Sequence, residues 1–183
     1  MKEKLLIHAC CGPCSAYPLR VLKDDFELLG FFSNSNIAPE EEYKKREQSF
    51  EDLCDAVGVN YVVDHYDPDS WNEAVKGLEN EPERGKRCEK CFEFRLRRAF
   101  EFAKKNKIKY ITTTLTVTPY KDTKMVFKTG QKLSDEYGVS FTPMDFKKND
   151  GFKKTLELAK KQGLYLQKYC GCIYSLKDRE AKQ

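Results

Sequence analysis

Short apolar runs alternate with longer amphipathic segments along the whole chain. The apolar runs predict five strands, at residues 4–9, 26–34, 59–66, 108–116 and 139–146. Between the strands, apolar residues recur at nearly helical spacing, as Phe92, Leu96 and Phe100 do, and this spacing predicts helices. We expect the helices at about residues 12–24, 39–57, 69–78, 89–106, 122–138 and 152–161.

Strands that alternate with helices are typical of an α/β fold, in which helices cover both faces of a parallel sheet. No repeat, low-complexity segment or Gly/Ser-rich linker divides the sequence, so we expect one domain over residues 1–183. In such folds the ligand site lies beyond the carboxyl ends of the strands. The segment ACCGPC, residues 9–14, follows the first predicted strand and is therefore expected at the site.

The composition is that of an ordinary soluble globular protein, with 40% apolar and 34% charged residues. No run of about 18 apolar residues occurs, so the sequence predicts no membrane-spanning helix. The apolar stretch near the N-terminus is too short for a signal peptide. We therefore expect a cytoplasmic protein that has no membrane partner.

Eight cysteines are the most informative feature of the composition. Structural disulfides are rare in the cytoplasm, so metal binding or redox chemistry is the better interpretation. Seven of the cysteines fall into three motifs: ACCGPC (Cys10, Cys11, Cys14), RCEKC (Cys88, Cys91) and YCGC (Cys170, Cys172). The eighth, Cys54, lies on the apolar face of a predicted helix and is expected in the core.

Two of these motifs contain cysteine pairs at the spacing that lets two thiolates bind one metal. The pairs Cys11–Cys14 and Cys88–Cys91 lie near predicted helix N-termini, where we expect the thiol pKa to be lowered. A structural zinc site needs only four ligands and usually closes a shorter loop than the more than 70 residues between these pairs. An iron–sulfur cluster fits the surplus of thiols better, and zinc is the alternative.

The CGC segment is a different kind of pair, because a single glycine separates its two cysteines. Cys170 and Cys172 could close a small, strained disulfide, and strained disulfides are typical of redox-active dithiols. The alternative is that one or both of them also bind metal.

Positive charge is concentrated in the segment from Arg84 to Lys109, which has eleven Lys and Arg against three Glu. The whole chain has a net charge of only +4, so this excess is local. It indicates either a solvated helix face or a surface that contacts phosphates.

The three cysteine motifs, in this order and on this α/β pattern, resemble the cobalamin-independent epoxyqueuosine reductases. The matching segments are HACCGPCSAYPL (8–19), RCEKCFEFRL (87–96) and YCGCIYS (169–175), with SNSNIAPEEEYKKR (33–46) and TTTLTVTPYKD (112–122) between them. The resemblance implies a Rossmann-like fold similar to the adenine-nucleotide α-hydrolase or PP-loop proteins. It also implies removal of the epoxide oxygen from epoxyqueuosine at the tRNA anticodon wobble position, which gives queuosine.

The resemblance further implies a 4Fe-4S cluster, with an additional iron nearby. By this likeness the cluster ligands are Cys10, Cys11, Cys88 and Cys91, and the redox-active pair is Cys170 with Cys172. Cys14 is then the candidate for the additional iron or for an alternative ligand. The electron donor is not identified by the sequence.

For the tRNA substrate, the expected phosphate contacts lie in the basic segment: Arg95, Arg97, Arg98, Lys104, Lys105 and Lys107. Candidate aromatic residues that could stack on the target base are Phe92, Tyr120 and Tyr174. Candidate acids are His8, Tyr120, Asp64 and His65, each of which is more simply explained by packing or hydrogen bonding.

Two other classes of protein remain open from the sequence. The first is a PP-loop ATP-dependent tRNA-modifying enzyme. The equivalent loop here, CCGPCS, has one glycine and a proline without an amide donor, so it is a poor phosphate cradle. The second is a non-enzymatic zinc module that binds RNA.

Overall fold

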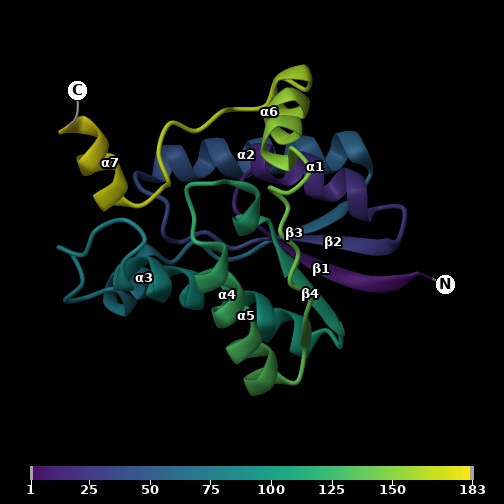
Figure 1. Cartoon of the computed structure of the whole chain (residues 1–183), viewed down its shortest axis with the longest axis horizontal. Coiled ribbons are helices and arrows are strands. Elements are labelled where there is room, and N and C mark those ends of the chain that lie inside the picture. Colours follow the sequence, from purple (N-terminus) through teal and green to yellow (C-terminus); the bar gives the residue numbers. More distant parts are fainter. Residues whose placement is uncertain (1, 182–183) are drawn as a thin grey trace.

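The structure is a computed structural model, and it describes residues 2–181 (Figure 1). The strands are β1 (Glu3–Ala9), β2 (Phe26–Phe32), β3 (Asn60–Val63), β4 (Tyr110–Thr113) and β5 (Ser140–Phe141). The helices are α1 (Gly12–Leu22), α2 (Glu40–Val57), α3 (Pro68–Ala74), α4 (Lys86–Lys105), α5 (Thr123–Tyr137), α6 (Gly151–Lys161) and α7 (Ile173–Glu180), with the 3₁₀ turn η1 (Thr114–Val117) after β4.

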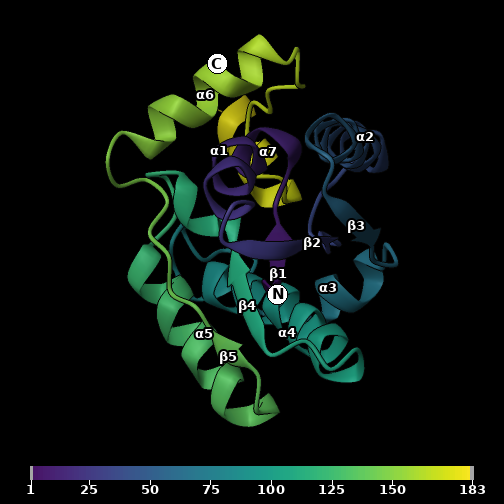
Figure 2. The same ribbon diagram turned by 90° about the vertical axis from the view of Figure 1, so that its right-hand side faces the viewer.

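All five strands are parallel and form one sheet in the order β3-β2-β1-β4-β5. Helices α1, α2 and α6 lie on one side of the sheet, and α4 and α5 lie on the other (Figure 2). Strands β2 and β3 are added on one side of β1, and the next strand in the chain, β4, pairs with the opposite side of β1. The strand order therefore reverses between β1 and β4, and the predicted Rossmann-like α/β fold is confirmed.

Strand β1 is the centre of the sheet and of the core. Its residue Ile7 pairs with Gly30 of β2 on one side and with Thr112 of β4 on the other. Leu5, Leu6 and Ile7 are all fully buried, as expected for a parallel strand that is covered on both faces. Because β1 ends at Ala9, the ACCGPC segment emerges at the point where the strand order reverses.

Strands β3, β4 and β5 are all much shorter than the apolar pattern indicated. Strand β4 ends at Thr113 because the hydroxyl of this residue accepts a hydrogen bond from the Leu115 amide and starts the turn η1. Strand β5 ends at Phe141, two residues before Pro143, which has no amide hydrogen to donate to a neighbouring strand.

Helix α7 was not predicted. It begins after Cys172, whose sulfur accepts a hydrogen bond from the Ser175 amide at 3.4 Å. Cysteine is not among the residues that usually begin helices, so no start signal for α7 is visible in the sequence. Figure 1 shows that α7 and α3 both lie at the end of the molecule opposite the N-terminus. Strand β1 runs from the N-terminus toward this end.

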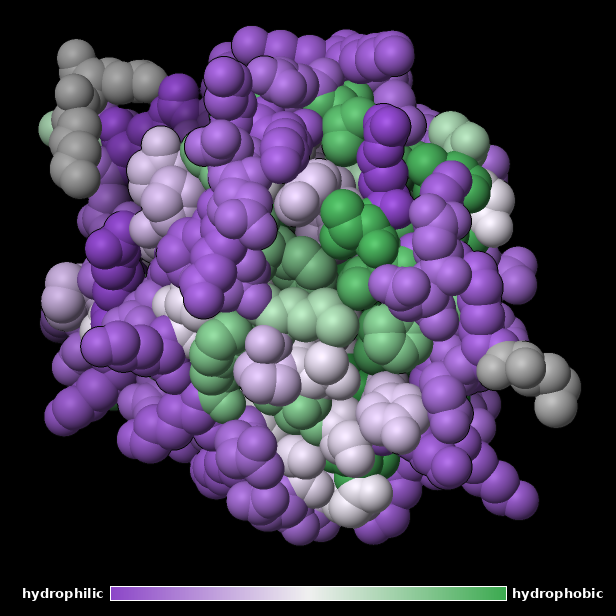
Figure 3. All heavy atoms as spheres, turned by 45° about the vertical axis from the view of Figure 1, so that its right-hand side comes forward, coloured by the Kyte–Doolittle hydropathy of each residue, from purple (hydrophilic) through white to green (hydrophobic). Residues whose placement is uncertain are grey.

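The surface combines charged and apolar regions. On the face drawn in Figure 3, hydrophobic residues gather in the middle and hydrophilic residues surround them. The exposed large apolar side chains of the described residues are Tyr120 (69% exposed), Val21 (39%) and Leu166 (37%). None of the helices within residues 2–181 is long and apolar enough to cross a membrane.

Gly12 lets α1 approach α2 closely, directly beside the cysteines. A Cβ atom at this position would lie 2.3 Å from the Ser49 carbonyl oxygen, which belongs to the backbone of α2. We predict that Gly12→Ala lowers the free energy of unfolding by about 2–3 kcal/mol, because the helices must move apart. Urea denaturation followed by circular dichroism measures this change.

Gly138→Ala is the matched control. Gly138 has a φ of 68° and open space around its Cβ position, so its substitution tests backbone strain alone, at about 1 kcal/mol. A Gly12→Ala protein as stable as the unsubstituted chain would contradict the close contact between α1 and α2.

Candidate active site

Three thiols converge at the end of β1. The sulfur atoms of Cys10, Cys11 and Cys14 all lie within 4.8 Å of one another, and those of Cys10 and Cys11 are 3.9 Å apart. All three side chains are buried. Cys11 precedes the first turn of α1, and its sulfur accepts a hydrogen bond from the Cys14 amide at 3.4 Å. Pro13 lies in that first turn, as predicted.

The turn after β4 holds this group from the other side. The Cys10 amide donates to the Thr114 hydroxyl at 3.0 Å, and the same hydroxyl donates to the Cys10 sulfur at 3.3 Å. Hydrogen bonds with Cys11 and Cys14 lower the pKa of Cys10, whereas burial raises the pKa of Cys11 to about 12. The three sulfurs therefore share protons that a thiophilic cation would displace on binding.

The other four motif cysteines form a second neighbourhood of thiols: Cys88, Cys91, Cys170 and Cys172. Burial raises the pKa values of the thiols of Cys88, Cys91 and Cys172, and the nearby Cys170 sulfur adds to the effect in each case. The cysteines of α4 thus lie near the CGC segment. Among the described residues, the tight group of three thiols includes Cys14 and includes neither Cys88 nor Cys91.

Our expectation of lowered thiol pKa values at the helix N-termini was therefore wrong for all four residues, because the thiol pKa values of Cys11, Cys14, Cys88 and Cys91 are raised. Only Cys10 has a lowered pKa, and its cause is the neighbouring thiols. At Cys11, Cys88 and Cys91, burial outweighs any stabilisation of the thiolate by the helix. Cys54 is fully buried in the core, as predicted.

Arg87 connects α4 to α7 beside this second neighbourhood. Its side chain is only 3% exposed, and its guanidinium donates to the Glu79 carbonyl at 2.9 Å. The same guanidinium stacks on the Tyr174 ring, with 4.6 Å from Cζ to the ring centroid. This contact holds two cysteine-bearing segments together, because Cys88 directly follows Arg87 and Cys172 lies two residues before Tyr174.

Two cationic side chains, Arg95 and Lys121, lie within charge range of cysteines from both thiol neighbourhoods. Arg95 lowers the thiol pKa of both Cys10 and Cys91, so its guanidinium lies within charge range of both. Burial opposes the charged form of Lys121, but Cys170, Cys10 and Cys14 outweigh it and raise the pKa of Lys121. The site therefore combines buried thiols with positive charge, which favours thiolate over thiol.

Arg95 is an unusual buried cation. It is 2% exposed, its Nη2 donates to Asn34 Oδ1, and its Nε has no hydrogen-bond partner. Within residues 2–181 no carboxylate forms an ion pair with it. A buried charge without a counterion is costly, so this arrangement fits an anionic group at the thiols.

A pocket of about 670 Å³ opens beside the thiols. It is lined by one cysteine from each motif, Cys14, Cys88 and Cys170, together with Tyr120 and Lys121. A volume of this size accommodates a small ligand such as a modified nucleobase. The three motifs, far apart in the sequence, therefore contribute to one site.

The predicted tRNA contacts are distributed differently from our expectation. Arg95 is buried and cannot reach a phosphate outside the protein, which corrects its assignment. Arg97 forms ion pairs with Glu93 and Glu136, and Arg98 forms one with Asp64, so these two guanidinium groups already have partners. Their role in phosphate binding stays a prediction.

Lys104 and Lys105 lie in the last turn of α4 and are exposed. The helix has 20 residues, which corresponds to a length of about 30 Å. Because the cysteines of α4 lie near its beginning, these lysines are at the far end of the helix from the pocket. Lys107 follows them in the exposed connection to β4.

The candidate acids His8 and Asp64 have structural partners. His8 is fully buried between the Thr113 hydroxyl (2.9 Å) and the Ser33 carbonyl (3.2 Å), and burial followed by the Arg95 charge lowers its pKa to about 3. Burial raises the pKa of Asp64, but hydrogen bonds from Arg98 and Ser33 outweigh it and hold the pKa below its ordinary value. Neither group is therefore poised to donate a proton near neutral pH.

Of the other candidates, His65 lies at the end of β3, where its carbonyl accepts a hydrogen bond from Arg98. Tyr120 and Phe92 both line the pocket, whereas Tyr174 packs against Arg87 and Trp71. Sequence reasoning missed Lys121, and its only signal was its position directly after Tyr120 in the TVTPYKD segment.

Fold and site together define an α/β protein of the PP-loop type that has buried thiols beside a pocket, at the point where the strand order reverses. A solved structure, the U34-tRNA thiolase NcsA from Methanococcus maripaludis with its [4Fe-4S] cluster, has this fold, with a TM-score of 0.58 and 17% sequence identity. The alignment covers 95% of this chain but only 61% of the thiolase.

The chain belongs to the family described as Epoxyqueuosine reductase QueH, whose sequence profile matches residues 5–178. Curated members include the proteins of Streptococcus pyogenes serotype M1 (34% identical, covering 97% of this chain and 72% of the relative) and Thermotoga maritima (34%, 97% and 93%). The protein of Acinetobacter baylyi is 35% identical over 96% of this chain and 82% of its own length.

This membership makes the chain an oxidoreductase of queuosine biosynthesis that reduces epoxyqueuosine to queuosine, with tRNA as its substrate. The resemblance found in the sequence is therefore confirmed. The buried group of Cys10, Cys11 and Cys14 provides a set of soft ligands that fits a metal centre.

The unpaired charge of Arg95 leads to a prediction. In protein treated with a chelator, Arg95→Met should leave the free energy of unfolding unchanged or raise it, because a buried cation without a carboxylate is removed. In metal-loaded protein the same substitution should lower it, because an anionic metal centre loses its counterion. Urea denaturation of both forms under anaerobic conditions measures the two effects.

Arg98→Met, on the same helix, is the control. Arg98 has Asp64 as its ion-pair partner, so its loss should destabilise both forms equally. A marked loss of stability in the chelated Arg95→Met protein would show that some other group already balances the charge of Arg95.

Proposed function

We propose that the thiols hold a 4Fe-4S cluster and that Cys170 and Cys172 form the dithiol that reduces epoxyqueuosine at the wobble position of tRNA. The observation that carries this proposal is the pocket lined by one cysteine from each of the three motifs. A single site with contributions from all three motifs explains why seven of the eight cysteines occur in them.

The proposed cluster ligands are Cys10, Cys11, Cys88 and Cys91. Cys14, which lies in the tight group with Cys10 and Cys11, is the proposed ligand of an additional iron or the alternative cluster ligand. When bound, the cluster would supply single electrons, and the additional iron would act as a Lewis acid toward an oxygen. The thiolase of the same fold was solved with its [4Fe-4S] cluster, which is consistent with this assignment.

The charges around the thiols suit such a group. Four thiolates around an iron–sulfur core carry net negative charge, and Arg95 and Lys121 lie within charge range of Cys10. Arg95 has no carboxylate partner among the described residues, so the cluster would be its counterion. A single structural zinc takes four ligands and would leave three of the seven motif thiols without a role.

The CGC dithiol can supply the electrons and the protons that the reduction consumes. Removal of the epoxide oxygen as water needs two electrons and two protons. Oxidation of the Cys170 and Cys172 thiols to a disulfide releases two of each, so one dithiol accounts for one turnover. Both cysteines are free in the structure, and Cys170 lines the pocket. An external electron donor must then reduce the disulfide for the next turnover.

Lys121 is the proton-holding group best placed beside the substrate. Its Nζ atom carries a proton because nearby sulfur raises its pKa, and its side chain lines the pocket. Opening an epoxide needs a donor at the oxygen, because an alkoxide is a poor leaving group. The Lys121 ammonium can donate a hydrogen bond to that oxygen while it leaves.

The pocket also has a surface for the base. The Tyr120 ring is 69% exposed and meets the Phe152 ring edge-on, with centroids 6.0 Å apart. Arg84 donates to the carbonyl of Pro119 at 3.0 Å and of Tyr120 at 3.1 Å, which holds the backbone at this ring. A base extruded from the anticodon loop would stack on Tyr120 with its modified side chain toward the thiols.

Phosphate contacts near the pocket would come from its basic lining residues, Arg84, Lys168 and Arg179. The exposed Lys104 and Lys105, at the far end of α4, stay as proposed contacts to a more distant part of the tRNA, together with the partnered Arg97 and Arg98.

The experiment is mass analysis of tRNA nucleosides after anaerobic incubation with reduced protein. We expect epoxyqueuosine to lose one oxygen, and we expect Cys170→Ser or Cys172→Ser to abolish turnover while iron and sulfide content stay unchanged. Cys54→Ala, a buried cysteine outside the motifs, is the control and should remain active.

Other outcomes would point elsewhere. Loss of iron in the Cys170 or Cys172 variants would make these residues ligands. Colourless protein with one zinc per chain and no reductase activity would favour the RNA-binding zinc module, and ATP-dependent pyrophosphate release would favour the PP-loop alternative.

The stacking role of Tyr120 predicts a separable effect. Tyr120→Ala should raise KM for tRNA about 5- to 150-fold, because stacking contributes about 1–3 kcal/mol per base. Tyr120→Phe keeps the ring and should stay close to the unsubstituted enzyme. Val21→Ala, at another exposed apolar residue, is the control, and an unchanged KM in Tyr120→Ala would exclude the stacking surface.

A further inference from the structure

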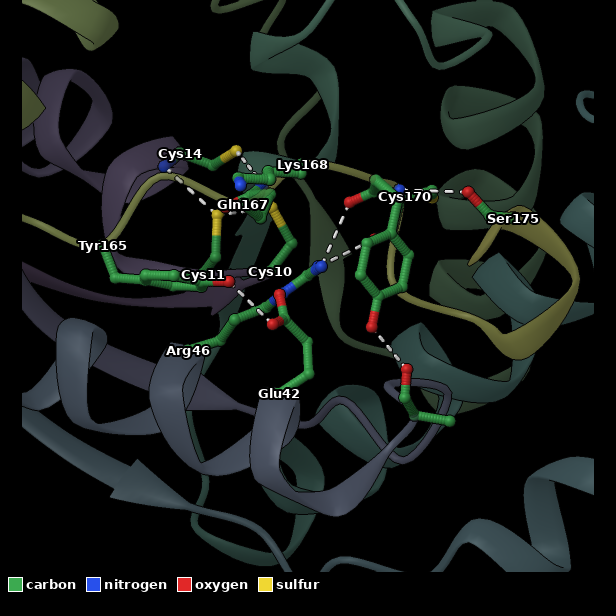
Figure 4. A network of polar contacts seen from close by, with 12 residues as sticks. Cys10, Cys11, Cys14, Glu42, Arg46, Tyr165, Gln167, Lys168, Cys170 and Ser175 are labelled. Atoms are coloured by element: carbon green, nitrogen blue, oxygen red, sulfur yellow. Dashed lines mark hydrogen bonds and ion pairs between the residues drawn. The ribbon is translucent and has the colours of Figure 1, made fainter. Parts of the chain in front are cut away.

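Arg46, in the second turn of α2, is a buried cation that the proposed reaction does not use. It is 1% exposed, and its Nε donates to Glu42 Oε1 at 2.8 Å on the same helix. The rest of its guanidinium points to the C-terminal segment. Nη1 donates to the Cys170 carbonyl at 2.9 Å, and Nη2 donates to the Tyr169 carbonyl at 3.1 Å (Figure 4).

Further contacts fasten this segment to the beginning of α2. The Tyr165 hydroxyl donates to Glu42 Oε2 at 2.7 Å, so both carboxylate oxygens of Glu42 have partners. The Tyr169 ring lies 5.0 Å from Arg46 Cζ, in a cation–π contact. The Ala38 amide donates to the Gly171 carbonyl at 2.9 Å. Arg46 is thus the centre of a polar network that holds residues 165–171.

The glycine of the CGC segment is explained by the same contact. Gly171 has a φ of 136°, which side chains other than glycine rarely adopt. A Cβ atom there would lie 3.0 Å from Arg46 Nη1 and 3.2 Å from Ile37 Cγ1. The segment between the two cysteines can approach Arg46 this closely only because it has no side chain.

On its other side, Arg46 faces the N-terminal cysteines. Burial raises the thiol pKa of Cys11, and the positive charge of Arg46 opposes this rise, so the guanidinium lies within charge range of that sulfur. Figure 4 shows Arg46 between Cys11 and Cys170. The Gln167 amide adds a contact to the Cys14 sulfur at 3.7 Å. The network therefore sets the position of the CGC segment relative to the first motif.

We propose that Arg46 is a positioning residue, whose planar guanidinium fork fixes the Tyr169–Cys170 backbone so that the Cys170 thiol faces the pocket. This inference rests on the proposed redox function of Cys170 and Cys172. A lysine at this position keeps the charge but cannot donate to two carbonyls and a carboxylate in one plane. The geometry of the fork, beyond its charge, is therefore the property that matters.

The test compares Arg46→Lys, Arg46→Gln and Gly171→Ala with the control Lys44→Gln. Lys44 lies on the same helix in an exposed ion pair with Glu40, so its substitution removes the same charge without touching the network. Circular dichroism and iron content confirm folding and metal loading. Single-turnover kinetics and the alkylation rate of Cys170, measured by mass spectrometry relative to buried Cys54, report the position of the thiol.

We expect Arg46→Lys and Gly171→Ala to lower kcat about 10- to 100-fold, because small displacements of a reacting group have effects of this size. KM for tRNA should change less than about twofold, and Cys170 should be alkylated several-fold faster. Arg46→Gln should have a larger effect in the same direction, and Lys44→Gln should match the unsubstituted protein.

Folded, iron-loaded Arg46→Lys with unchanged kcat and unchanged alkylation of Cys170 would overturn the proposal. If Arg46→Gln does not fold, the lysine and Gly171 variants decide the question. If the unsubstituted protein shows no reductase activity, the proposed redox function fails, while the alkylation rates still show whether Arg46 positions Cys170.

Discussion

The pairing of β1 with two parallel neighbours is the constraint on which the rest of this structure depends. Because β1 is hydrogen-bonded to β2 on one side and β4 on the other, its end is fixed at the reversal of the strand order. The next two residues are Cys10 and Cys11, and the first turn of α1 adds Cys14. The position where related folds present amide donors to phosphate therefore presents sulfur instead.

The electrostatics of the site follow from burying these thiols. Burial alone raises the pKa of Cys11 and Cys91, which disfavours the thiolate that a metal needs. Arg95 and Lys121 act in the opposite direction, and Arg95 has no carboxylate partner in the described part of the chain. A metal centre with net negative charge would satisfy both the thiols and the cations, whereas either set alone is costly to bury.

The site is completed by segments that come from distant parts of the chain. Helix α4 brings Cys88 and Cys91, and the segment before α7 brings Cys170 and Cys172. The two arrangements that hold these segments use the same chemistry, a buried arginine that donates to backbone carbonyls and stacks on a tyrosine: Arg46 with Tyr169, and Arg87 with Tyr174. Guanidinium groups suit this role because one planar group can serve several acceptors at once.

The sequence by itself determined the alternation of strands and helices, the place of ACCGPC after the first strand and the set of seven motif cysteines, because these depend on local periodicity and spacing. Only the tertiary structure decided that one cysteine from each motif lines the same pocket and that α7 begins at a cysteine. It also decided that Arg95 is buried, although arginine is usually found at the surface. These features depend on contacts such as that between Arg46 and Cys170, 124 positions apart, which no local pattern encodes.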